Sequence, residues 1–150
     1  MDAGARPGWL IRTLGGALGR PSRKPPCASA ALGKLGEKLA RKALRRAGLK
    51  VLASNYRCPT GEIDLIALLP SRRDGDVLVF VEVKTRASDF FTPPSSAVNA
   101  DKQRRLRRSA DYYASTHPQA AGLTRRYDVV SVVAAPDQPA RVEHIQDAFG

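Results

Sequence analysis

Two short apolar segments, residues 61–67 and 77–86, constrain the fold of this chain more than any other part of its sequence. Both are rich in β-branched and aliphatic residues, and the polar break between them contains Pro70, Asp74 and Gly75. That composition predicts two adjacent β-strands joined by a turn. Because side chains alternate along a strand, the valines at positions 77, 79, 81 and 83 are predicted to share one buried face.

Charged residues interrupt both apolar strands. The alternation places Glu82 and Lys84 beside Phe80 on the second face of the later strand. The same rule divides the earlier strand into one face with Glu62, Asp64 and Ile66 and another with Ile63, Leu65 and Ala67. If the strands pair, Asp64 comes close to Glu82, and two carboxylates and an ammonium converge among apolar residues. Such charges are costly unless they are paired or bind a metal.

Two interpretations of these charges follow. Two carboxylates suit a hard cation such as Mg²⁺, which is usually held by one or two acids together with waters and substrate phosphate. Lys84 would then orient the attacking water and offset charge on the phosphate. The alternative is a buried acid paired with Lys84 for structural reasons alone.

The ordered set of motifs resembles a known group of proteins. Asp64, followed by Glu82-Val83-Lys84, resembles the D…(D/E)xK core of the PD-(D/E)xK nuclease superfamily. Over about residues 31–135 the chain is similar to the YraN-like family, through Gly33-x-x-Gly36-Glu37, Asn55-Tyr56-Arg57, residues 61–66 and 80–86, Lys102 and residues 127–130. Ile63 stands where the superfamily has a proline, and the YraN-like pattern also has an aliphatic residue there. Within the superfamily the layout most resembles archaeal Holliday-junction resolvases.

This resemblance implies a fold and an activity. The fold is an α/β, restriction-endonuclease-like sandwich with a mixed central β-sheet flanked by helices, as the order of predicted elements also suggests. The activity is hydrolysis of DNA phosphodiester bonds, for example in branched or damaged DNA, with Mg²⁺ or Mn²⁺. Asp64, Glu82 and the Val83 carbonyl would hold the metal, Lys84 would position water and Glu37 would complete the site. A catalytically silent nucleic-acid-binding adaptor is the second hypothesis, and an RNA-associated protein is the third.

Glu37 lies on a predicted helix. Apolar residues recur every three or four positions from Ala30 to Ala47, which is typical of an amphipathic helix, and Gly48 ends it. Glu37 borders the apolar stripe, where an acid can face a cleft beside the sheet. From the helix alone, a solvated glutamate paired with Arg41 is the alternative.

The chain is strongly basic, with 25 Lys and Arg against 14 Asp and Glu and a net charge of +11, which favours a polyanionic partner. A second helix, predicted from about Asn99 to Ser115, carries five cations within two turns. We expect nucleic acid as the partner, DNA rather than RNA, with phosphates held by Arg86, Lys102, Arg104, Arg105 and Arg108. A solvated charged face is the alternative. In the preceding loop, Phe90 and Phe91 would either stack on an unpaired base or fill the core.

The rest of the sequence predicts the domain boundaries, the cellular location and the oligomeric state. Residues 1–30 are predicted to be a basic, disordered extension and residues 31–150 the endonuclease-like domain. Cys27 and Cys58 form no metal or disulfide pattern, and no apolar run is long enough for a membrane span, so we expect a cytoplasmic protein. A homodimer is expected because the domain is small and related resolvases dimerise. Asp128 is predicted to be a hydrogen-bonding anchor, and no site role is predicted for His117 or His144.

Overall fold

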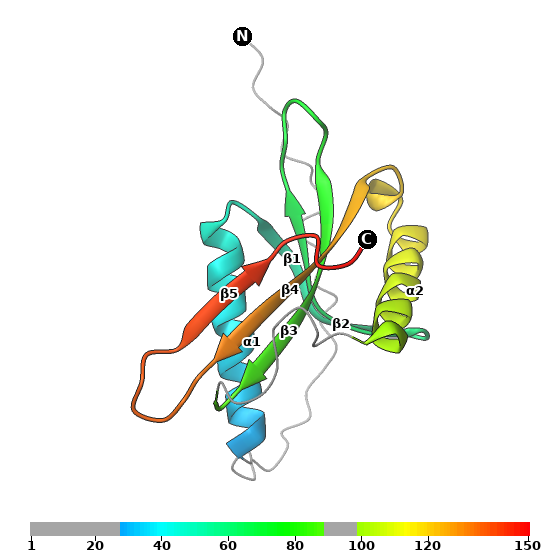
Figure 1. Ribbon diagram of the computed structural model, residues 1–150. Coiled ribbons are helices and arrows are strands. Elements are labelled where there is room, and N and C mark those ends of the chain that lie inside the picture. Colours follow the sequence, from blue (N-terminus) through cyan, green and yellow to red (C-terminus); the bar gives the residue numbers. More distant parts are fainter. Residues whose placement is uncertain (1–27, 89–98) are drawn as a thin grey trace, which may run out of the picture.

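Five strands form one mixed sheet in the order β1-β2-β3-β4-β5, seen in the computed structural model, which describes residues 28–88 and 99–150 (Figure 1). The elements along the chain are α1 (Ala28–Arg46), β1 (Lys50–Cys58), β2 (Gly61–Leu69), β3 (Val77–Arg86), α2 (Ala100–Thr116), the 3-10 helix η3 (Pro118–Ala120), β4 (Thr124–Val133) and β5 (Arg141–Ile145). The strands β1, β2 and β3 run antiparallel to one another, β3 and β4 are parallel, and β5 returns antiparallel to β4. Parallel neighbours need a long crossover, and the segment that contains α2 provides it.

The two helices cover opposite faces of this sheet (Figure 1). The helix α1 buries Ala40 and Leu44 against a face that includes Val79 and Val81 of β3. The helix α2 packs in a second core around Phe80 of β3. Since neighbouring residues of a strand point to opposite sides, this division confirms the predicted alternation in residues 77–86. The predicted α/β sandwich with a mixed sheet is also confirmed.

A glycine brings α1 close to the end of β3. A Cβ atom at Gly36 would lie 2.8 Å from Thr85 Cβ and closer still to its Oγ1, so only glycine fits there without movement. The close approach places the first half of α1 beside the part of β3 that contains Glu82 and Lys84.

One prediction about β2 is wrong. Strict alternation places Ile63 on the face of Leu65, but Ile63 packs with Phe80 in the core under α2, whereas Leu65 packs under α1. The strand pair reverses its faces between the partners Ser54↔Leu65 and Tyr56↔Ile63. Asn55 lies between them in β1 with φ +52°, a left-handed conformation that asparagine tolerates better than most residues. This irregularity lies directly beside Asp64.

The predicted disordered extension, residues 1–30, lies outside the described residues except for residues 28–30, which instead form the start of α1. The predicted roles of Phe90 and Phe91 also fall outside the described residues. Within residues 28–88 and 99–150, neither helix is long and apolar enough to cross a membrane.

Candidate functional site

The site forms where β2 and β3 stop pairing. Their ladder joins residues 65–69 of β2 to residues 81–77 of β3, and Asp64 and Glu82 are the next residues on the two strands. Here the Val83 backbone N–H donates a hydrogen bond to Asp64 Oδ2 over 2.8 Å. A carboxylate thus accepts from β3 at the end of the ladder, next to a second carboxylate.

The electrostatics of Asp64 show how close the two acids are. The pKa of Asp64 is raised from 3.8 to about 6, mainly because burial disfavours the charged form and also because of the nearby negative charge of Glu82. The Val83 N–H and the Lys102 ammonium oppose this rise but do not cancel it. A cation shared by Asp64 and Glu82 would favour the ionised form of both acids.

Glu82 is almost completely buried, with 2% of its surface exposed, and it lies between two lysines. Its Oε1 is 3.1 Å from Lys84 Nζ on the same strand and 2.6 Å from Lys102 Nζ in the first turn of α2. The predicted proximity of Glu82 and Lys84 is therefore confirmed. A purely structural ion pair would show this contact as well, so the raised pKa of the adjacent Asp64 is the feature that points to chemistry.

Glu37 lies apart from this group. Its Oε2 accepts a hydrogen bond from Asn55 Nδ2 over 2.9 Å, and Arg41 lies 3.5 Å from Ser54 Oγ. Glu37 is not one of the largest influences on the pKa of Asp64. Its contribution to a metal site remains a prediction, and what the structure adds is a direct link to the irregular residue of β1 that lies beside Asp64.

The residues present fit a magnesium ion held by two acids. In the described ranges 28–88 and 99–150, no three His, Cys, Asp or Glu side chains are placed to bind a metal together. Two carboxylates are nevertheless enough for Mg²⁺, which keeps several waters and takes further oxygens from a substrate phosphate. Carboxylate oxygens are also the ligand type that Mg²⁺ and Mn²⁺ prefer.

The predicted phosphate-binding residues have different surroundings. Asn99 caps α2 by accepting a hydrogen bond from the Lys102 backbone N–H over 2.9 Å, which fixes the start of the helix at the site. The side chains of Arg104, Arg105 and Arg108 are exposed on α2, and Arg104 pairs with Asp101. Arg86 ends β3, and its carbonyl accepts from the Ala134 N–H over 2.8 Å. Their role in phosphate binding stays a prediction.

Two contacts could not be found from the sequence. Lys102 was expected to bind phosphate, but no spacing indicates that it reaches Glu82, because that contact depends on how α2 packs. His144, for which no role was predicted, lies 2.7 Å from Asp128 Oδ2 because β5 is registered against β4. Asp128 is fully buried, which opposes its ionisation, but the hydrogen bonds from His144, Arg126 and the Asp147 N–H lower its pKa below the usual range. The predicted anchor role of Asp128 is therefore confirmed.

Comparison with known proteins gives one family. A family model described as "Uncharacterised protein family UPF0102" matches residues 36–132. A UPF0102 protein of Syntrophus aciditrophicus is 46% identical over 117 residues, covering 78% of this chain and 87% of that protein. A UPF0102 protein of Beutenbergia cavernae is 46% identical over 116 residues, covering 77% and 93%. One of Streptomyces coelicolor is 46% identical over 118 residues, covering 78% and 87%.

Proposed function

Because this chain belongs to the UPF0102 family, and the matched residues 36–132 include every side chain of the site described above, we propose that it is a metal-dependent nuclease of the PD-(D/E)xK type. The proposed reaction is hydrolysis of phosphodiester bonds in DNA, including branched or damaged DNA. The observation that carries this proposal is the raised pKa of Asp64 beside the buried Glu82, at the point where β2 and β3 separate. Perturbed acids of this kind are concentrated at functional sites.

Each side chain has a role in this proposal. Asp64 and Glu82 would hold the metal, helped by the Val83 carbonyl, and the metal would supply positive charge near the reacting phosphate and lower the pKa of a bound water. Lys84, whose side chain is 26% exposed, positions the water that attacks phosphorus. Lys102, 44% exposed at the rim, contacts a phosphate next to the one that is cut. Glu37 acts through Asn55 and the adjoining strand or through water.

The exposed arginines of α2 extend the site along a nucleic-acid backbone. Arg104, Arg105 and Arg108 follow Lys102 within two turns of the same helix. A backbone that crosses the carboxylates would therefore meet a row of cations. Positively charged side chains that contact phosphates supply affinity but do not distinguish one nucleotide sequence from another.

The second candidate is a nucleic-acid-binding adaptor without cleavage. One observation favours it: both lysines already neutralise Glu82, at 3.1 and 2.6 Å, as they would in a structural ion pair. In this case the basic surface would bind nucleic acid, and the acids would only stabilise the fold.

Cleavage of labelled DNA separates the two candidates. Duplex, single-stranded and four-way-junction DNA are incubated with Mg²⁺ or Mn²⁺ and the wild-type protein, Asp64→Asn or Lys84→Met. Exposed residues provide matched controls, Asp101→Asn and Lys50→Met. We expect cleavage to fall by about 100-fold or more in both site variants and to persist in both controls.

Two outcomes would contradict the nuclease. Cleavage that is equal in wild type and both site variants would come from a contaminant. No cleavage by any protein, with binding that weakens steeply as salt rises, would establish the adaptor.

A further inference from the structure

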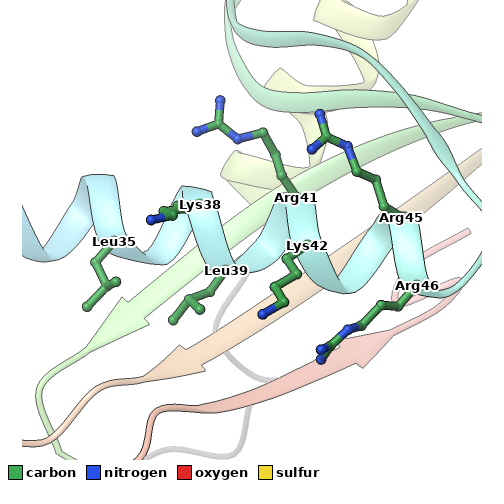
Figure 2. A pocket seen from close by; sticks show the side chains of 7 residues that line it. All are labelled: Leu35, Lys38, Leu39, Arg41, Lys42, Arg45 and Arg46. Atoms are coloured by element: carbon green, nitrogen blue, oxygen red, sulfur yellow. The ribbon is translucent and has the colours of Figure 1, made fainter.

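The outer side of α1 carries a groove that the proposed nuclease chemistry does not use. Figure 2 shows its lining: Leu35, Leu39, Lys42 and Arg46 project from one side of the helix, and Lys38, Arg41 and Arg45 project from the other. Its volume is about 740 Å³, enough for several phosphate groups rather than one small ion. Five of its seven lining residues are cations.

Within the part of the chain that the structure describes, few acids offset the positive charge of this groove. The helix α1 contains six Lys and Arg but a single acid, Glu37, whose carboxylate accepts from Asn55. Across residues 28–88 and 99–150, no carboxylate forms an ion pair with Lys38, Lys42 or Arg46. These three cations follow one another at intervals of four residues, and like charges at that spacing repel each other. An external polyanion would relieve this repulsion.

The groove is separate from the carboxylate site. The inner side of α1 packs on the face of the sheet that contains Leu65 and Val81. Glu82, the next residue of β3, points to the opposite face, where Lys102 of α2 contacts it. A ligand in the groove and a ligand at the carboxylates would therefore lie on opposite sides of the sheet.

The spacing of the cations suits a nucleic-acid backbone. Residues 38 and 46 are eight positions apart, which corresponds to about 12 Å along a helix that rises about 1.5 Å per residue. Phosphates of one DNA strand advance by about 3.4 Å along the duplex axis, so three or four of them lie alongside this row.

Other occupants fit less well. A membrane-surface helix needs a broad free apolar face. In α1 that face is used inside the fold, where Ala40 and Leu44 have no exposed surface, and Leu35 is its one exposed large apolar residue. Residues 1–27 contain five Arg and Lys and a single acid, Asp2, so like charge disfavours them, and it disfavours a second copy of this chain with net charge +11.

We propose that the α1 groove binds a second length of nucleic-acid backbone, so that one molecule holds two segments, one on each side of the sheet. This binding goes beyond the proposed nuclease activity, because it requires neither a metal nor the carboxylates. Nucleic acids that present two segments close together, such as bent or branched molecules, would be held more tightly than a single short duplex.

The number of short duplexes bound per chain tests the proposal. The probe is a labelled duplex of about 12 base pairs, titrated in EDTA at low salt into the full-length protein and followed by anisotropy and calorimetry. We expect two duplexes per wild-type chain and one per Lys38→Gln/Lys42→Gln chain. Each lost phosphate contact removes about 0.9 from the slope of log K against log salt, so the salt slope summed over all bound duplexes should fall by at least about 2. Glutamine is a good helix former, so α1 is retained, and circular dichroism checks this.

A matched control variant and two other probes show which results would overturn the second binding site. Arg72→Gln/Arg73→Gln removes the same charge from the exposed β2–β3 turn and should leave two duplexes bound. An unchanged number of duplexes in Lys38→Gln/Lys42→Gln, or an equal loss in the control, overturns the proposal. The proposal is also overturned if Lys38→Gln/Lys42→Gln still binds two duplexes but no longer binds phosphatidylglycerol vesicles or a polyglutamate peptide. That result would assign the groove to a membrane or to an acidic protein.

The test is independent of the nuclease proposal. Asp64→Asn should abolish cleavage and still bind two duplexes. If the wild-type protein cleaves DNA but binds only one duplex, only the second binding site is refuted. If it binds two duplexes but does not cleave DNA, only the nuclease proposal is refuted.

Discussion

Replacing Asp64 by asparagine is expected to make the protein more stable at neutral and alkaline pH. The folded state raises the pKa of Asp64 from 3.8 to about 6, so between these values it binds a proton more tightly than the unfolded chain does. The free energy of unfolding therefore falls as pH rises through this window and levels off above it. At about 1.36 kcal/mol per pKa unit, the cost of ionising Asp64 in the fold reaches at most about 3 kcal/mol. Asparagine avoids this cost, and its side-chain oxygen can still accept from the Val83 N–H.

Urea unfolding at two pH values measures this effect. We expect Asp64→Asn to exceed wild type by up to about 3 kcal/mol near pH 8 and to match it near pH 4, where the wild-type carboxyl is protonated. Mg²⁺ should reduce the difference in free energy of unfolding between Asp64→Asn and wild type at pH 8, because a ligand at 100 times its Kd stabilises the wild type by about 2.7 kcal/mol. Asp74→Asn, in the exposed β2–β3 turn, should change stability by less than about 0.5 kcal/mol. A variant no more stable than wild type at pH 8, or a gap of equal size at both pH values, would refute the reasoning.

Three further predictions concern the framework of the site. Gly36→Ala should lower the free energy of unfolding in urea by about 1–3 kcal/mol, because its Cβ would overlap Thr85. Adding Thr85→Ala should restore part of that stability. An unchanged free energy of unfolding in Gly36→Ala would mean that α1 can shift. Asp128→Asn should cost about 3–5 kcal/mol at neutral pH, because it leaves the Arg126 guanidinium, only 17% exposed, without its carboxylate partner. It should also make stability fall less as pH drops below about 4, and an unchanged fall would be incompatible with the lowered pKa of Asp128. Asn99→Ala should cost about 1 kcal/mol through loss of the cap on the Lys102 N–H, and a neutral result by thermal unfolding would show that the cap is dispensable.

Local periodicity was sufficient to predict most of the framework. The valines of residues 77–83 follow a fixed period, so the buried face of β3 was predicted correctly. The apolar spacing in residues 30–47 predicted the helix α1 and the burial of Leu44, but Leu35 of the same apolar stripe is 42% exposed. The family resemblance, which depends on ordered motifs, gave the layered arrangement. Asp128 was predicted as an anchor and has no exposed surface.

The contacts that the sequence missed depend on tertiary geometry. Ile63 was placed on the wrong face because a period-two rule assumes a regular strand, whereas β2 changes faces between Ile63 and Leu65, next to the left-handed Asn55 of β1. The link between Lys102 and Glu82 depends on where α2 begins relative to the end of the β2–β3 ladder. The distance between the Lys102 and Glu82 side chains therefore cannot be predicted from a local sequence pattern.

Asp64 and Glu82 are proposed to share one divalent cation, and a Mn²⁺ titration followed by electron paramagnetic resonance measures this binding without any nucleic acid. Free Mn²⁺ is measured as it is added to wild type, Asp64→Asn, Glu82→Gln and the control Asp101→Asn. We expect one bound ion per chain in wild type and control. We expect the affinity to be reduced by 10-fold or more in each site variant, since losing a ligand costs at least as much as the 10- to 100-fold typical of supporting residues. Equal Mn²⁺ binding by all four proteins, or no binding by any of them, would contradict it.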